Sequence, residues 1–370
     1  MIFTANTSQI NKACSNVMRA VSVKGAIPTI EGILLQTGDN CLNLTGYDFE
    51  FGMHTSIEAE VREPGAIVIN AKMLCEIIKK LEAPTVTFEI SGVSAMIKSG
   101  AAVYNVTGIN ASEYPELPSV SGGYPLFLDK NILRSMVEQT IYAVADDDNP
   151  IPVYKGIKFE VTKNTVRLIG VNGVHFAMRT ENVKYDGSDL SVIVPKKTIK
   201  EVIKLIDDEG DDNVSISVGK RHIVFEINSY SVISRLLDGK FIDYNAVIPK
   251  TTKTTVLLNT SEAIRCIERM KPVIEEDRKN PVRCLFDGSE MRISTVSALG
   301  RVVDYMPVNC AGERIEIGFN SRYLLEALRA ADTDQVKVEL NSPVTAAKIL
   351  PLNGDSFLFL VLPMRLKNEI

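Results

Sequence analysis

Three copies of one pattern, spaced 125 residues apart (197 − 72 and 322 − 197), are the strongest constraint on how this chain folds. The pattern is a short apolar strand, a helix cap and an amphipathic helix, and it occurs at residues 67–81, 192–206 and 315–330. Lys72, Lys197 and Arg322 hold the same place in the three copies. A repeat of this length is a whole domain rather than a solenoid unit of about 20–50 residues. We therefore expect one kind of domain, used three times.

The composition fits a folded protein of several domains. Of the 370 residues, 45% are hydrophobic and 24% are charged, as in ordinary globular chains, and this length favours two or three domains. The formal net charge of −5 argues against a uniformly basic nucleic-acid binder, but it is compatible with a basic surface on an acidic protein. The sequence has no membrane-length apolar run and no signal peptide, so we expect a cytoplasmic protein.

The six cysteines never reach a C-x-x-C spacing. Cys14 and Cys75 fall on or beside the apolar side of expected helices. Buried, reduced thiols are therefore expected, rather than a metal or redox site.

Each third of the chain is expected to contain two helices and about eight strands. The first helix has apolar residues at i, i+3, i+4 and i+7, which places them on one stripe: Ile10, Ala13, Cys14 and Val17. In the second third the corresponding stripe runs from Leu133 to Val144. A strand is expected at residues 49–57, where polar and apolar residues alternate.

Two proline-containing segments divide the thirds. ASEYPELP (111–118) and FIDYNAVIP (241–249) both place an acid–Tyr pair before a proline, which interrupts strand pairing. We set the domains at 1–121, 122–250 and 251–370. Each is expected to be an α+β layer in which two helices cover one face of antiparallel sheet.

The repeated helix has two faces. Its core stripe in the first copy consists of Leu74, Ile77, Ile78 and Leu81, and Lys72, Glu76 and Lys79 lie roughly 180° away. Glu76 is four residues from both Lys72 and Lys80, so we expect i,i+4 ion pairs. For one helix, a solvated charged face is the simplest interpretation. Basic residues at the same positions of all three copies favour another interpretation, in which equivalent helices line one space with Lys and Arg. Duplex DNA is the partner that suits such a space, because its phosphates are regularly spaced.

Catalytic patterns are absent from the sequence. There is no G-x-x-x-x-G-K-[ST], no G-x-G-x-x-G and no H-E-x-x-H, and His54, His175 and His222 are far apart. The acidic runs at 146–148 and 207–212 offer carboxylates to a metal, but each follows a helix and suits a solvated loop. A DNA-processing enzyme that uses these acids, and a protein-only scaffold with solvated basic faces, remain alternative hypotheses.

Several longer motifs resemble the bacterial DNA polymerase III beta subunits, the sliding clamp family. They are TGYDFE (45–50), FIDY (241–244), IGFNSRYLLEAL (317–328) and LPMRL (362–366), set in a threefold domain repeat. The resemblance covers the whole chain and implies a head-to-tail homodimer whose six domains close a ring around duplex DNA. It implies no catalytic residue, metal or cofactor.

The implied function is topological. The ring would slide on DNA without sequence specificity and tether polymerase, so that processivity comes from effective concentration. The implied partners are double-stranded DNA, the DNA polymerase III alpha subunit, the clamp loader, and other replication and repair proteins that carry clamp-binding peptides.

The resemblance also assigns residues. It implies channel contacts at Lys24 and Lys197, and the repeat adds others by position. The full set of expected DNA-facing residues is Lys12, Lys24, Lys72, Lys79, Arg134, Lys196, Lys197 and Lys200. The dimer joint is expected to pair strand 103–107 with strand 301–308, with contacts from Tyr104, Val106, Val273, Ile274 and Asp304.

A peptide pocket is implied between the second and third domains. Its expected walls are Tyr154, Val171, Gly173, Val174, His175, Phe176, Ile242, Val247, Leu360 and Leu362, with a neighbouring part made by Asn320, Tyr323, Val344, Pro363, Met364, Arg365 and Leu366. The family usually has a T-D-G-H-R-L-like run where this chain has VNGVHF (171–176), and an arginine is common at Ala246. The pocket is therefore expected to be more apolar than is usual.

Overall fold

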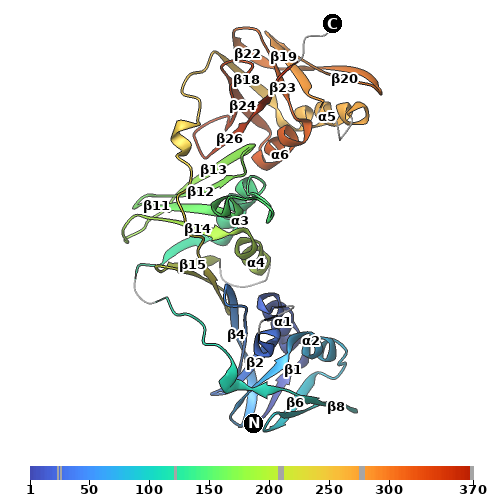
Figure 1. Cartoon of the computed structure of the whole chain (residues 1–370), viewed down its shortest axis with the longest axis vertical. Helices are drawn as coiled ribbons and strands as arrows, with labels where there is room; N and C mark the ends of the chain where they lie inside the picture. The colour runs from blue at the N-terminus through green and yellow to red at the C-terminus, as the bar shows by residue number, and fades with distance from the viewer. Residues whose placement is uncertain (23–24, 26, 121–122, 207–211, 275–279, 367–370) are drawn as a thin grey trace. The chain divides into compact units, whose positions relative to one another are not determined.

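The computed structural model describes residues 1–22, 25, 27–120, 123–206, 212–274 and 280–366. The chain divides into two compact units, one formed by Met1–Asn131 with Lys197–Leu236 and the other by Ile132–Lys196 with Leu237–Ile370. Figure 1 shows the elements in chain order, from blue at the N-terminus to red at the C-terminus.

The first unit is built on antiparallel sheet. Its strands are β1 (Ile2–Asn6), β2 (Gly32–Gly38), β3 (Cys41–Tyr47), β4 (Phe51–Glu63), β5 (Ala66–Asn70), β6 (Thr85–Ser91), β7 (Ser94–Ser99), β8 (Ala102–Thr107), β9 (Ile109–Asn110), β10 (Leu126–Asp129), β15 (Asn213–Val218), β16 (His222–Ile227) and β17 (Tyr230–Arg235). The main path has the order β10-β15-β16-β17-β4-β1-β6-β7-β8. This sheet therefore joins strands of the first and second thirds, because β17 pairs with β4 from Tyr230↔Thr55 to Ser234↔Phe51.

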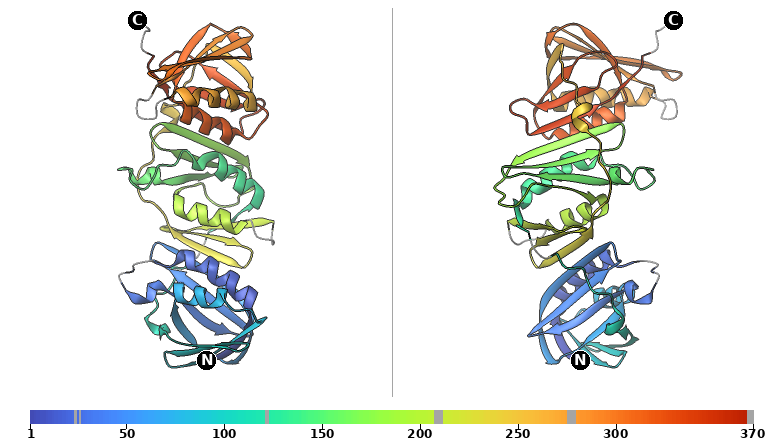
Figure 2. Two further views of the ribbon diagram at one scale, coloured as in Figure 1. Left: turned by 90° about the vertical axis from the view of Figure 1, so that its right-hand side faces the viewer. Right: turned by 60° about the vertical axis from the view of Figure 1, so that its left-hand side comes forward.

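Helices cover one face of this sheet. They are α1 (Thr7–Val17), α2 (Ala71–Lys79) and α4 (Lys196–Ile206), and α1 and α2 lie side by side (Figure 2). The predicted stripe of α1 is buried, with Ile10, Cys14 and Val17 fully inaccessible. Asn6 caps this helix by accepting hydrogen bonds from the amides of Ser8 and Gln9, the role for which asparagine is favoured at helix starts.

The second unit contains two sheets. Its strands are β11 (Gly156–Val161), β12 (Thr165–Val171), β13 (His175–Asn182), β14 (Leu190–Pro195), β18 (Thr254–Asn259), β19 (Val282–Asp287), β20 (Glu290–Ser297), β21 (Gly300–Pro307), β22 (Asn309–Gly312), β23 (Ile315–Phe319), β24 (Gln335–Leu340), β25 (Ala347–Pro351), β26 (Phe357–Val361) and β27 (Pro363–Met364). The sheet orders are β14-β11-β12-β13-β26-β25-β24-β18-β22 and β21-β20-β19-β23-β27. Again a sheet crosses from one third to the next, because β13 pairs with β26.

The helices of the second unit are α3 (Lys130–Ile141), α5 (Thr260–Met270) and α6 (Ser321–Ala331). α5 and α6 lie side by side (Figure 2) and pack on strands of both sheets. Each third of the chain thus contributes two helices among the described residues, as predicted. The compact units do not follow the thirds, because β17–β4 and β13–β26 pairing carries sheet across the joints and divides the central third between the units.

Two predicted element ends are wrong. Phe49 was expected in a strand, but it has a positive φ of 72°, and the strand begins at Phe51 because Asp48 Oδ1 accepts the amides of Glu50 and Phe51 in a turn. The second-third helix ends at Ile141 rather than Val144, and the amide of Val144 closes a turn onto the Ile141 carbonyl. The six cysteines are free thiols, but the predicted burial holds for only half of them, since Cys14, Cys266 and Cys284 are buried and Cys41, Cys75 and Cys310 are half-buried.

Candidate functional sites

The charged face of α2 points to solvent as predicted. Lys72, Glu76 and Lys79 are exposed, whereas Leu74, Ile77 and Ile78 are buried. Leu81 follows the helix and is half-buried. The expected i,i+4 pairs do not form, since Glu76 makes no ion pair with Lys72 or Lys80 in the described part of the chain. The two lysine ammonium groups therefore remain open to an external anion.

The basic residues of α4 differ in their surroundings. Lys197 is 55% exposed, and its Nζ lies 2.8 Å from Asp48 Oδ2 and 5.2 Å from the centre of the Phe51 ring. Lys200 is exposed. Lys196 is less available, because its Nζ donates to the Val144 carbonyl at 3.1 Å and to Asp146 at 2.9 Å. Lys196 therefore anchors the loop after α3.

The remaining predicted DNA-facing residues are dispersed. Lys12 is exposed on α1 and lines a cavity of ≈ 330 Å³ beside the β16–β17 turn. Arg134 is half-buried on α3. Lys24 lies outside the described residues.

An apolar cluster in the second unit gathers much of the predicted peptide pocket. Val171, Phe176 and Leu360 are buried in it, with Tyr154 and Ile242 packed against its side. The prediction omitted several members of the same cluster, which are Val153, Phe241, Tyr244 and Ala346. The aromatic residues of FIDY were the available signal, since the Tyr244 hydroxyl donates to Glu160 at 2.6 Å and its ring packs 5.7 Å from Phe176.

Apolar side chains near this cluster remain open to solvent. Val247 is 44% exposed, Leu362 is 45% exposed and Val344 is 73% exposed. Isolated apolar residues at a surface need no explanation, so a shared role of these three in one docking surface stays a prediction.

His175 does not belong to that exposed surface. It is 3% exposed, and its ring lies edge-on to Tyr323 at 4.7 Å and to Tyr142 at 5.3 Å. Burial lowers the pKa of His175 to about 4, although the Tyr323 backbone carbonyl, as a hydrogen-bond acceptor for the ring, raises it, and the charge of Arg322 lowers it further. The ring is therefore neutral at pH 7, and the 3.4 Å contact of its Nε2 with Glu326 is not an ion pair there.

The β12–β13 hairpin keeps its shape despite its unusual sequence. Asn172 Oδ1 accepts the amides of Val174 at 3.1 Å and His175 at 2.8 Å. Gly173 has φ +92°, a conformation that favours glycine. Val174 is half-buried.

The C-terminal motif is docked by backbone pairing. Met364 pairs with Gly318 and Pro363 with Phe319. A Cβ on Gly318 would lie 2.5 Å from a methyl carbon of Leu366 and 2.8 Å from the Met364 carbonyl oxygen, so only glycine lets the segment approach this closely. Asn320 caps α6 by accepting the amides of Arg322 and Tyr323, and Arg365 is exposed.

The two strands predicted for the dimer joint are both edge strands. β8 ends the main path of its sheet and β21 ends the five-stranded sheet. On β8, Tyr104 and Val106 are half-buried, while Val103 is 54% exposed. Val273 and Ile274 are half-buried after α5. Asp304 is engaged within the chain, where its Oδ2 accepts from Arg269 Nε at 2.6 Å.

The acidic residues do not converge in the described part of the chain. No group of three or more His, Cys, Asp or Glu residues is placed there to hold a metal ion. Asp146 pairs with Lys196, and residues 207–211 lie outside the described residues. Among the described helices, none combines the length and apolarity needed to span a bilayer.

Comparison with known proteins gives a consistent result over the whole length. Family models described as the N-terminal, central and C-terminal domains of the DNA polymerase III beta subunit match residues 1–118, 127–243 and 245–365. The chain is 28% identical to the beta sliding clamp of Bacillus subtilis over 378 residues, covering 99% of this chain and 100% of the relative. It is also 28% identical to the beta sliding clamp of Synechococcus elongatus, with 100% of both chains covered.

Solved structures agree. The crystal structure of the DNA polymerase sliding clamp from Bacillus subtilis matches with a TM-score of 0.95 at 27% identity, covering 99% of this chain and 100% of that one. The DNA polymerase III subunit beta from Pseudomonas aeruginosa matches with a TM-score of 0.93 at 26% identity over 99% and 100% of the chains.

Proposed function

Because the chain belongs to the DNA polymerase III beta subunit family, we propose that it functions as a sliding clamp. It is an accessory subunit rather than a catalyst. A ring of two protomers encircles duplex DNA, slides without reading sequence, and holds the polymerase close to its template. Tethering raises the effective concentration of polymerase at the primer end, so processivity does not need tight binding to DNA.

The observation that carries this proposal is the pair of open edge strands, β8 and β21, in a chain that all three domain models of the family match. In the described part of the chain β8 and β21 each have one unpaired side, and an open edge is a ready template for pairing with another chain. Head-to-tail pairing of β8 with the β21 strand of a second protomer closes a ring of six domains, with domain limits near residues 121 and 250. Val103 and Tyr305, both 54% exposed, add apolar surface at this joint.

DNA contact is assigned to the exposed helix faces. The best-placed of the predicted DNA-contacting residues are exposed on α2 and α4. They are Lys72, Lys79, Lys197 and Lys200. The set also contains Lys12, Arg134 and Lys24. Lys196 is assigned a lesser part, because its ammonium group already donates to Val144 and Asp146 in the loop after α3. Contacts between ammonium groups and phosphates are independent of sequence and exchange readily, which suits sliding.

Partner proteins are assigned to the apolar cluster and its exposed rim. An extended peptide with apolar anchors fits Val247, Val344 and Leu362, and the docked segment 363–366 forms the neighbouring part. The partners that carry such peptides are the DNA polymerase III alpha subunit, the clamp loader, and other replication and repair proteins. Because DNA and these partners are found together at the nucleoid, we assign the chain to the cytoplasm, at the nucleoid.

The test is retention on DNA of different topology. The protein is loaded onto nicked circular DNA, and the bound fraction is measured before and after linearisation at one site. A topological ring is retained on the circle and lost from the linear molecule. Equal retention on both would contradict encirclement, and metal-dependent nuclease activity lost in Asp146→Ala would favour an enzyme instead.

A further inference from the structure

The turn after α1 (Thr7–Val17) contacts α4, and the turn after α3 (Lys130–Ile141) contacts α6, through corresponding residues of the repeat. The residue before α1 is Asn6 and the residue before α3 is Asp129. Counted from these two residues, Arg19 and Tyr142 are both 13 positions further on (19 − 6 and 142 − 129). Asn16 and Gln139 both stand ten positions after it (16 − 6 and 139 − 129), and Glu201 corresponds to Glu326 (326 − 201 = 125). The first contact lies within the first unit and the second within the second unit.

In the first contact a cation joins the helices. Arg19 Nη1 lies 3.3 Å from Glu201 Oε2, and Arg19 Nη2 donates to Asn16 Oδ1 at 2.5 Å. The side chains of Arg19 and Glu201 are only 23% and 13% exposed. At this site with little water the guanidinium donates a hydrogen bond to the Asn16 amide oxygen and pairs by charge with the carboxylate, although Glu201 Oε2 itself accepts no hydrogen bond among the described residues.

In the second contact the cation is missing, because Tyr142 replaces arginine. Gln139 is 6% exposed, and its Nε2 donates to the Ala331 carbonyl at 3.1 Å. Its Oε1 has no hydrogen-bond partner among the described residues, and neither has the buried hydroxyl of Tyr142. A buried acceptor left without a donor destabilises the folded chain, because it has lost its hydrogen bonds to water and gained none.

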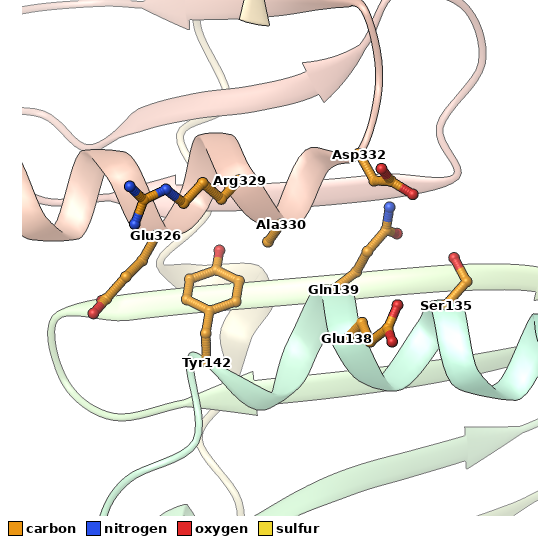
Figure 3. A pocket seen from close by; sticks show the side chains of 8 residues that line it. All are labelled: Ser135, Glu138, Gln139, Tyr142, Glu326, Arg329, Ala330 and Asp332. Atoms are coloured by element: carbon orange, nitrogen blue, oxygen red, sulfur yellow. The ribbon is translucent and has the colours of Figure 1, made fainter. Parts of the chain in front are cut away.

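A cavity of ≈ 410 Å³ lies at this place, between α3 and α6 (Figure 3). We call it the α3–α6 cavity. Its volume is in the range of small-molecule sites, about 300–1,000 Å³. Figure 3 shows the side chains of Gln139 and Tyr142 reaching from α3 toward α6, where Glu326 and Asp332 lie.

The charge of the cavity wall favours a positive ligand. Glu138, Glu326 and Asp332 contribute carboxylates, and Arg329 is the lining residue with positive charge. Arg329 is already engaged, since its Nη2 lies 2.5 Å from Glu268. Arg322 Nε reaches Glu326 Oε1 at 3.4 Å from a side chain that is 76% exposed. Burial still raises the pKa of Glu326, even though Arg322 and Arg329 lower it, so the carboxylate is not fully compensated.

We propose that the α3–α6 cavity binds a small organic cation with a guanidinium or primary ammonium group. The cation donates a hydrogen bond to Gln139 Oε1 and is attracted by the carboxylates of the cavity wall, so it supplies a positive charge where the first contact has Arg19. This ligand site is separate from the peptide surface, and it does not depend on the proposed clamp function.

The test is calorimetric titration of the full chain with three probes that share a butyl chain. Butylguanidinium and butylammonium are the cations, and butylurea is their neutral counterpart. We expect both cations to bind and butylurea to bind at least tenfold more weakly. Equal binding of butylurea, or heat from none of the probes, would overturn the proposal and leave only water in the cavity.

Variants localise the binding. Gln139→Leu removes the amide acceptor and is expected to weaken butylguanidinium binding about tenfold. Tyr142→Arg restores the residue type of the first contact, so it is expected to abolish binding and to raise the melting temperature. The matched control is Glu76→Gln, an exposed change at the position of the first repeat that corresponds to Glu326. It is expected to leave both binding and the melting temperature unchanged. Unaltered binding to Tyr142→Arg at an unchanged melting temperature would refute the site.

Discussion

The ammonium nitrogen of Lys197 lies 2.8 Å from Oδ2 of Asp48, a residue 149 positions earlier in the chain. The pair connects the start of α4 with the turn before β4. Lys197 is 55% exposed, and exposed ion pairs contribute roughly 0–1 kcal/mol. A DNA phosphate can therefore compete with Asp48 for the ammonium group at little cost.

Changing either member of this pair should alter DNA association in opposite directions. Asp48→Asn keeps the oxygen that accepts the Glu50 and Phe51 amides but removes the competing charge, so we expect tighter association at low salt. Lys197→Glu should weaken it and reduce the slope of log affinity against log salt by about one per protomer. Fluorescence anisotropy over a salt series measures both, with Lys163→Glu in the exposed β11–β12 turn as the charge-matched control. The same loss in Lys163→Glu would mean that net charge, and not position, is responsible.

Truncating the docked tail should weaken partner binding without affecting assembly. Met364→Ala with Leu366→Ala removes apolar surface that lies against β23, and we expect peptide affinity to fall about 5- to 30-fold, or about 1–2 kcal/mol. Titration with a fluorescent clamp-binding peptide gives the affinity, and sedimentation gives the oligomeric state. Leu352→Ala, at an exposed turn, is the control. An unchanged peptide affinity in the double variant would remove the tail from the partner site.

The open edge of β8 can be tested at single amides. Ser99 and Ala102 pair across a two-residue turn, so hydrogen-bonded and non-hydrogen-bonded pairs alternate from there and the Asn105 amide points away from β7. Asn105→Pro removes that donor while leaving the β7 pairing in place. We expect the dimer seen by sedimentation velocity to dissociate at higher concentration than that of Asn105→Ala. Equal dissociation of the two variants would show that β8 does not pair with a second chain.

Stability should fall as the pH is lowered through the range set by His175. Its pKa is about 4 in the folded chain and about 6.5 when unfolded, so between these values the unfolded state binds more protons and is favoured. Glu326 acts in the opposite sense, because burial raises its pKa and protonation then favours the folded state. Arg322 faces the pair, with its Nε 3.4 Å from Glu326 Oε1.

Urea unfolding at pH 7 and pH 5 isolates the histidine. His175→Gln should lose less stability than the parent between these two pH values. His222→Gln, the same change at a half-buried position on β16, should behave like the parent. A parallel loss in all three proteins would assign the pH dependence to other groups.

Local patterns predicted the repeated elements well, because a strand, a cap and an amphipathic stripe each leave a signal within one segment. The buried Ile10 and Leu74 stripes and the exposed Lys72 face are examples. Contacts between distant segments were not predictable in this way. The Lys197–Asp48 pair and the engagement of Asp304 by Arg269 depend on which elements meet. The burial of His175 depends on aromatic neighbours from α3 and α6, which no spacing in the β12–β13 hairpin reveals.

The ladders that join neighbouring repeats have a mechanical consequence. Five residue pairs connect β17 to β4, and five connect β13 to β26. Pulling two repeats apart at either place means breaking a cooperative run of backbone hydrogen bonds together, rather than extending a flexible tether. In the proposed ring, a loading machine that must part the protein to admit DNA would therefore meet its lowest resistance where β8 and β21 of different chains touch.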